Sequence, residues 1–191
     1  MVWEEIIFSS HSHADLLAPI IYFKYKPFLI DSGTFVYNGD PHNRNIFRVT
    51  KAHNNVTWNK NNLYIPKLNF GWENVCDALL VDSKSNFNET KLSFILKDIK
   101  GYKRTFNVSE YIVEIIDSFG LISNEYVSFN FYLHPDCQIV KSSEQFIVIE
   151  NEGARVAFSS DISSVEINKS EVSFDYGVKR ENSCIHINRK N

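Results

Sequence analysis

The sequence predicts an all-β protein, specifically an antiparallel, multi-stranded β-sandwich. Phe, Tyr, Ile, Val and Ser are abundant and Ala is scarce, and this composition favours strands over helices. No stretch keeps a helical apolar period over a dozen residues, so no helical region is expected. Short apolar or alternating runs recur instead at roughly 8–12-residue spacing, with polar turn residues between them, which is the pattern of a sandwich or barrel.

The expected strands follow one another along the chain, and each is a run of apolar or alternating residues bounded by turn-forming residues. In chain order they are 20–25, 28–30, 75–81, 92–96, 111–116, 127–133, 146–149, 155–158, 172–176 and 184–187. Turns are expected at Asn38-Gly39, Gly101, Gly120, Gly153 and Gly177, because these residue types adopt the backbone angles that tight turns need.

Length and charge bound the organisation and exclude several classes of protein. The chain has 191 residues, with 20 Lys and Arg against 23 Asp and Glu, and a formal net charge of −3. We predict a single domain over residues 1–191 that buries about 70% of its unfolded surface, so its core needs no disulfides. The charge balance speaks against a nucleic-acid-binding face, and the apolar runs are too short to span a membrane.

The N-terminal sequence MVWEEIIF lacks the basic start and the long apolar stretch of a signal peptide. We therefore expect either a cytosolic chain or a piece of a longer exported protein. The three cysteines, Cys76, Cys137 and Cys184, lie far apart and show no CxxC spacing. They predict neither a disulfide framework nor a cysteine-based zinc site, and we interpret them as buried apolar residues.

Residues 9–62 hold the polar groups that point to chemistry, so we place the candidate metal and substrate-facing site there. An early part of this segment is Ser-His-Ser-His-Ala-Asp, which ends at Asp15. In a strand, side chains alternate between two faces, so His11, His13 and Asp15 would share one face. A polar edge strand that faces water would produce the same pattern, and this alternative stays open.

Two later residues extend the pattern. Asp31 follows directly after the apolar strand 28–30, and His53 stands at the entry to another expected strand. Two histidines and a carboxylate with an open coordination position are a recurrent catalytic zinc arrangement. Spacing alone does not establish that these residues meet His13, and Asp15 is an alternative to Asp31 as the carboxylate ligand.

Three blocks of sequence, taken in order, resemble one known family. They are HSHADLL at 11–17, KPFLIDSGTFVYNGDP at 26–41 and FRVTKAHNNVTWN at 47–59. Their order, spacing and local chemistry resemble the C-terminal domain of the heparinase II/III-like polysaccharide lyases, most densely over residues 9–59. Beyond these residues only the rhythm of the strands is similar.

The resemblance implies a role for each matching position. His11 would face the substrate and either transfer a proton or neutralise a uronate carboxylate. Arg48 and Asn54 match positions that flank the site and orient it. The implied ligands of a metal ion, usually zinc in this family, are His13, Asp31 and His53.

Two further residues are predicted to lie near the cleft. Tyr37, just after the DSGT turn, is expected either beside the substrate or as an aromatic side chain on the rim. Arg44 lies in the segment 40–44, which we interpret as a turn-like polar loop. From such a loop, the guanidinium of Arg44 can touch an acidic sugar, or it can simply be solvated.

Members of this family cleave beside a uronic acid by β-elimination. A base removes the C5 proton, a donor group stabilises the enolate-like charge, and an acid protonates the leaving oxygen. A histidine titrates near neutral pH and suits either proton transfer. The implied partner is an acidic, uronic-acid-containing polysaccharide, and the implied location is the periplasm or the cell exterior.

The family's N-terminal helical toroid supplies the catalytic Tyr, and nothing in these residues matches it. We therefore expect a C-terminal lyase domain that folds and binds zinc but turns over substrate poorly or not at all without a toroid partner. The alternative is a non-catalytic carbohydrate-binding or assembly module that retains the metal site for stability. A cupin-like metalloenzyme fits less well, because its ligands would include a Glu and a further His at closer spacings.

Overall fold

The structure is a computed structural model, and it describes residues 7–8, 11–58, 64–68, 70–97, 99, 101–120, 126–159 and 165–190. Residues 9–10 and 59–62 of the predicted site segment lie outside the described residues. Within the described ranges, every ladder between named strands is antiparallel. The predicted fold class, all-β with antiparallel sheets, is confirmed.

Strands make up most of the regular structure in the described part of the chain. The helices are α1 (Pro41–Arg48) and the 3-10 turn η1 (Thr50–Ala52). The strands are β1 (Ile7–Phe8), β2 (Ile21–Phe23), β3 (Lys26–Leu29), β4 (Val56–Trp58), β5 (Pro66–Lys67), β6 (Gly71–Trp72), β7 (Ala78–Ser85), β8 (Glu89–Leu96), β9 (Lys103–Ser109), β10 (Val113–Ser118), β11 (Tyr126–Tyr132), β12 (Gln138–Ser142), β13 (Phe146–Asn151), β14 (Ala154–Ser159), β15 (Val165–Val172) and β16 (Arg180–Lys190). No helix among the described residues is long and apolar enough to cross a membrane.

The chain forms two compact units, one of residues 1–75 and 125–191 and the other of residues 76–124. The smaller unit is one sheet in the order β10-β9-β8-β7. Its buried Arg104 pairs with Asp117, with Nε 2.7 Å from Oδ1 and Nη2 2.9 Å from Oδ2. The single domain over residues 1–191 stays a prediction, because two compact units do not test whether the chain folds as one.

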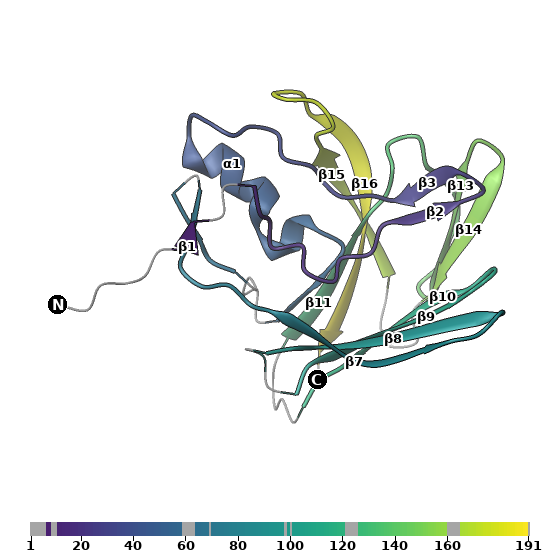
Figure 1. Ribbon diagram of the computed structural model, residues 1–191. Coiled ribbons are helices and arrows are strands. Elements are labelled where there is room, and N and C mark those ends of the chain that lie inside the picture. The colour runs from purple at the N-terminus through teal and green to yellow at the C-terminus, as the bar shows by residue number, and fades with distance from the viewer. Residues whose placement is uncertain are drawn as a thin grey trace. The chain divides into compact units, whose positions relative to one another are not determined.

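The larger unit carries the sheets that position the candidate site. One sheet runs β15-β16-β11-β4, a second runs β12-β13-β14, and β2 pairs with β3. Strand β3 of the β2–β3 hairpin lies beside β13 (Figure 1). The fully apolar core lies between these strands and is made of Phe28, Leu29, Leu133, Ile147, Ile149, Ala154 and Ile185. Removing these side chains from water fixes β3 against β11, β13 and β16.

A backbone bridge extends β3 to the end of β11. Leu29 pairs with Leu133, and the amide of Ile30 donates to the carbonyl of Tyr132 at 3.0 Å. The chain leaves the core at this point, so the residue after Ile30 stands where the buried strand meets the surface. Asp31 is that residue, as the sequence predicts.

The expectation that the chain has no helical region is wrong, and so is the polar loop at 40–44. Helix α1 begins there, because the Asp40 carboxylate accepts the amide of His42 at 2.9 Å and Pro41 occupies the first turn. The helix is eight residues long and buries two arginines, Arg44 and Arg48, four residues apart on one face. A helix this short, with charged residues on its inner face, gives no apolar period to detect.

One expected strand is also wrong, and a condition set for residues 11–15 is not met. Residues 11–15 form no strand, so alternation does not determine where His11 and His13 point. Strand β15 ends at Val172, and the chain from 173 to 179 is a hairpin turn, although its residues alternate like a strand. The other nine expected strands overlap β2, β3, β7, β8, β10, β11, β13, β14 and β16.

The turn between β15 and β16 is joined to the loop that follows β3. The amide of Ser173 donates to the carbonyl of Ser32 at 2.8 Å, and the amide of Gly177 donates to the carbonyl of Phe35 at 2.7 Å. Gly33 lies between these bonds and bridges Ser173. A Cβ on Gly33 would lie 1.8 Å from the carbonyl oxygen of Ser173, so only glycine permits this approach.

Gly33→Ala tests this contact. The φ of Gly33 is 82°, and the left-handed conformation alone costs an alanine about 1–2 kcal/mol. We expect a larger loss in the free energy of unfolding, measured in urea, because the added Cβ also pushes the turn away. Gly153→Ala is the matched control, since Gly153 has a φ of 81° and no atom within 4 Å of an added Cβ. Equal losses in the two variants would contradict a tight contact between loop and turn.

Candidate functional site

The segment that carries His11 and His13 is irregular, and hydrogen bonds to its backbone and side chains hold it in place. The amide of Ala14 donates to the carbonyl of Arg48 at 2.8 Å. The side-chain amide of Asn55 donates to the carbonyl of Leu16 at 2.8 Å. The Trp72 indole N–H donates to Ser12 Oγ at 2.7 Å. These bonds tie the segment to α1, to the residues before β4 and to β6, so tertiary contacts set the direction of both histidines.

Asn54 holds the backbone on which Asp31 stands. Its side-chain amide donates to the carbonyls of Ile30 at 2.9 Å and Pro19 at 2.7 Å, while its Oδ1 accepts the amide of Tyr132 at 2.6 Å. The residue is buried, so it organises three chain segments. This agrees with the flanking, orienting role that the resemblance implies, although its effect on function stays a prediction.

Asp31 and His53 meet directly. His53 Nδ1 lies 2.6 Å from Asp31 Oδ2, and Asp31 Oδ1 accepts the amide of Gly33 at 2.8 Å. The His53 side chain is fully buried at the end of η1, and its Nε2 has no hydrogen-bond partner among the described residues. The His13 ring lies 5.3 Å from the His53 ring, centroid to centroid. One ligand atom from each of His13, Asp31 and His53 lies within 4.8 Å of the others.

The electrostatics of these groups suit a cation. Burial, together with the charge of the nearby His53, lowers the pKa of His13 to about 4. Burial acts to raise the pKa of Asp31, but the hydrogen bond and charge of His53 and the amide of Gly33 outweigh it, so this pKa falls below its usual value. At neutral pH His13 is therefore uncharged with a free lone pair and Asp31 is ionised, which are the forms that bind a metal.

The three residues fit a divalent metal ion. A buried imidazole nitrogen without a partner costs about 1–3 kcal/mol, and His53 Nε2 is such an atom. Two imidazoles and one carboxylate are ligands that suit zinc. Asp15, the alternative carboxylate, does not belong to this group among the described residues.

His11 is exposed and contacts Tyr37. Its ring meets Tyr37 edge to face, with centroids 5.5 Å apart and an interplanar angle of 69°. The Arg44 guanidinium lies 4.8 Å from the centre of the Tyr37 ring and donates to the carbonyl of Val36 at 3.1 Å. Arg44 is fully buried on α1 and also lies over the Phe70 ring, 5.2 Å from its centre, so its guanidinium does not reach solvent.

Arg48 joins several parts of the site from inside. It is fully buried, and its guanidinium lies 4.1 Å from the centre of the Trp72 ring. It donates at 3.5 Å to the carbonyls of Ser12, Leu68 and Gly71. No local motif predicts the contact between Trp72 and Arg48, because the two residues come from distant segments.

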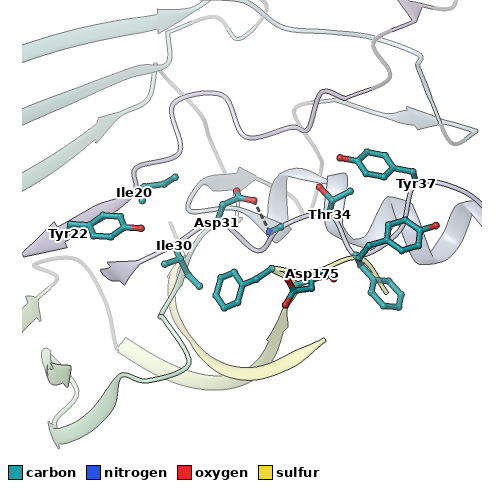
Figure 2. A pocket seen from close by; sticks show the side chains of 12 residues that line it. Ile20, Tyr22, Ile30, Asp31, Thr34, Tyr37 and Asp175 are labelled. Carbon is teal, nitrogen blue, oxygen red and sulfur yellow. Dashed lines mark hydrogen bonds between the residues drawn. The ribbon is translucent and has the colours of Figure 1, made fainter. Parts of the chain in front are cut away.

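A cavity of about 430 Å³ opens beside Asp31. Figure 2 shows Tyr22 and Tyr37 on opposite sides of it, with Asp31 and Asp175 between them. Its lining residues are Ile20, Tyr22, Ile30, Asp31, Gly33, Thr34, Phe35, Tyr37 and the turn residues Ser173, Phe174, Asp175 and Tyr176. The Tyr176 ring is nearly parallel to that of Tyr37, with centroids 6.3 Å apart. Sequence reasoning missed these turn residues because it assigned them to a strand.

A family model and several solved structures match nearly the whole chain. A family model described as heparinase II/III-like, C-terminal, matches residues 5–189. The solved structure of heparan sulfate lyase HepC from Pedobacter heparinus gives a TM-score of 0.75 over 94% of this chain at 17% identity. That of a heparinase III, the BT4657 gene product, gives 0.76 over 95% at 21% identity. The chain spans 28% of the length of each of these two proteins. No curated protein sequence matches it.

Arg48→Ala tests whether the buried arginine holds the site segments together. We expect the free energy of unfolding to fall by about 3 kcal/mol, because several buried carbonyls lose a charged donor and Trp72 loses its stacking partner. Arg155→Ala is the matched control, since its side chain is exposed and pairs with Glu150; it should cost less than about 1 kcal/mol. Thermal and urea denaturation measure both, and a small loss at Arg48 would contradict this role.

Proposed function

The chain belongs to the heparinase II/III-like family, matching its C-terminal domain, and from this premise we propose that it is the metal-bearing half of a polysaccharide lyase. The substrate is an acidic polysaccharide that contains uronic acid, cleaved by β-elimination. A helical domain outside these 191 residues completes the active site. The solved relatives, named as a heparan sulfate lyase and a heparinase III, support the substrate class, and this chain spans 28% of the length of each.

His11 is the catalytic residue that this chain contributes. In β-elimination a base takes the C5 proton, the electron pair forms a C4–C5 double bond, the C4–O4 bond breaks, and O4 receives a proton. Negative charge develops on the uronate as the C5 proton leaves, so a positioned N–H donor lowers the barrier. His11 is exposed and rests against Tyr37, so its imidazole can donate to that carboxylate or exchange a proton with the sugar.

His13, Asp31 and His53 hold a divalent metal ion, which we propose to be zinc. When bound, the ion would supply a positive charge at these three residues and a fixed link between the three segments. The protein's own part is to present neutral imidazole and ionised carboxylate atoms in a buried place, with Asn54 and the Gly33 amide keeping Asp31 in position. The observation that carries the proposal is the buried, unpartnered Nε2 of His53 within this group.

The substrate also bears on location. Acidic polysaccharides of this kind lie outside the cytoplasm, so we propose that the protein works in the periplasm or at the cell exterior.

Four further residues support the site: Tyr37 from the rim, and Arg44, Arg48 and Asn54 from buried positions.

Metal content tests the site. We expect the purified chain, loaded with zinc and then dialysed, to hold about one zinc ion, measured by mass spectrometry, and to melt at a higher temperature with zinc than without. His13→Ala and His53→Ala should lose both the ion and the shift, because each removes a ligand. His42→Ala is the control, since His42 is exposed on α1 and lies outside the ligand group. Zinc retention in both ligand variants would refute this site.

Activity measurements test whether cleavage needs a helical domain in addition to this chain. Incubated alone with heparan sulfate, the zinc-loaded chain should produce almost no unsaturated uronate, which is followed by its ultraviolet absorbance, because one half of the active site is absent. Binding should persist, and His11→Ala should weaken it relative to His42→Ala. Efficient cleavage by the chain alone would contradict the proposal that a second domain completes the active site. Binding that is unchanged in His11→Ala would favour a carbohydrate-binding module without a catalytic histidine.

A further inference from the structure

We propose that Lys179 is a positioning residue for one part of the candidate site. Its ammonium holds Phe35 in a strained turn, and this turn directs the Tyr37 ring to His11. The consequence for catalysis rests on the proposed function, because the contact between Tyr37 and His11 matters there only if His11 acts on a substrate. The positioning itself concerns the protein alone, so it is tested without a substrate.

The backbone at Phe35 adopts a conformation that its own side chain disfavours. Its φ is 63°, in the left-handed region, where a bulky residue is an outlier. The amide of Val36 donates to the carbonyl of Thr34 at 2.9 Å, so the residues on either side of Phe35 are bonded to each other. A three-residue turn with a positive φ at its centre is the rare, strained form of the γ-turn. Such a conformation persists only where the surrounding structure imposes it.

Contacts from the β15–β16 turn and from α1 impose it. The carbonyl of Phe35 accepts the amide of Gly177 at 2.7 Å. The Phe35 ring packs against the ring of Phe47 on α1, with centroids 5.6 Å apart. Lys179 Nζ lies 4.9 Å from the centre of the Phe35 ring and 5.6 Å from that of Phe47. Both distances lie within the range of about 6 Å at which a cation is attracted to an aromatic face.

The ammonium of Lys179 is itself held in place. Its Nζ lies 2.8 Å from Glu171 Oε2 on β15, and 28% of the Lys179 side chain is exposed. A partly desolvated ammonium is attracted to an aromatic face more strongly than a fully hydrated one. Glu171 therefore orients the charge, and the rings of Phe35 and Phe47 receive it. The charge stabilises the Phe35 ring in the place that the strained backbone requires.

The strained turn determines where the next aromatic residue lies. Val36 follows Phe35, and its carbonyl accepts Arg44 Nη1 at 3.1 Å. Tyr37 comes next, and its ring lies 5.5 Å from that of His11, centroid to centroid. If Phe35 relaxed to a negative φ, the direction of the chain after it would change, and Tyr37 would leave His11. The charge of a residue far along the sequence thus acts on the candidate catalytic histidine through the backbone.

NMR signals of the His11 imidazole report this contact, because an aromatic ring shifts the signals of nuclei beside it. The chain has six histidines, and His11→Ala identifies the signals of His11. Tyr37→Ala gives their position without the contact. Lys179→Met removes the charge and nearly keeps the length of the side chain. We expect it to move the signals at least about half of the way to the Tyr37→Ala position, because Phe35 loses its cation. Unchanged signals in Lys179→Met would overturn the proposal.

A conservative variant and a control separate the cation from other effects. Lys179→Arg keeps a cation for the rings and should leave the signals of His11 in place. Glu171→Gln keeps a hydrogen-bond acceptor for the ammonium and should also leave them nearly in place. Lys91→Met is the matched control, because Lys91 Nζ lies 3.5 Å from Asp82 Oδ2 in the other unit. A displacement as large as that of Lys179→Met in any of these three variants would contradict the role of the cation.

Phe35→Leu tests the same interaction from the side of the ring. Leucine keeps an apolar side chain but has no aromatic face, so we expect a displacement similar to that in Lys179→Met. The double variant should move the signals of His11 no further, because both changes break one interaction. Additive displacements would show that Lys179 and Phe35 act separately, and they would refute the positioning role. This variant also tests the proposal independently of how well Lys179→Met folds.

The outcomes separate this inference from the lyase proposal. A chain that takes up zinc and binds heparan sulfate, but whose His11 signals do not respond to Lys179→Met, would refute the positioning role alone. A chain whose His11 signals respond as expected but that takes up no zinc would uphold the positioning role and refute the metal-bearing half of a lyase.

Discussion

The contact between His53 Nδ1 and Asp31 Oδ2, at 2.6 Å, is the interaction on which the site depends. It joins the loop after β3 to the segment before β4, and it does so at a fully buried imidazole. Burying such a pair is costly unless the remaining polar atoms also find partners. The Gly33 amide meets this need for Asp31, while the need of His53 is unmet at Nε2. A metal ion bound to Nε2 would give that atom a partner. The same buried nitrogen therefore favours metal binding on grounds of both stability and ligand chemistry.

Buried polar side chains, more than apolar ones, hold the segments around this pair. Asn54 bonds to backbone groups of three segments, and Arg48 donates to three carbonyls while stacking on Trp72. Burial lowers the pKa of Arg48 to about 10, helped by the neighbouring Arg44, so Arg48 stays charged at neutral pH. It lies in the last turn of α1, where the carbonyl end of a helix favours a cation. Such partners are directional, so they fix the irregular segment of His11 and His13 more exactly than apolar contacts could.

The sequence predicts some of this arrangement well and some of it wrongly, for physical reasons. Asp31 at the end of a buried strand follows from local pattern, and the grouping with His13 and His53 follows from the family resemblance. Their meeting could not be deduced from spacing, because contacts from Ala14 to Arg48 and from Trp72 to Ser12 bring the segments together. Helix α1 was missed because it is short and two of its three buried residues are arginines. The β15–β16 turn was missed because its residues alternate as in a strand. The contact that makes it a turn, between Gly33 and Ser173, joins distant parts of the sequence.

Tyr37 connects the two chemical regions of the site. One part of its ring meets the edge of His11, and the ring is nearly parallel to that of Tyr176 in the cavity. Arg44 supports it from the buried side. A polysaccharide that places one sugar in the cavity and the next beside His11 would therefore follow one aromatic surface.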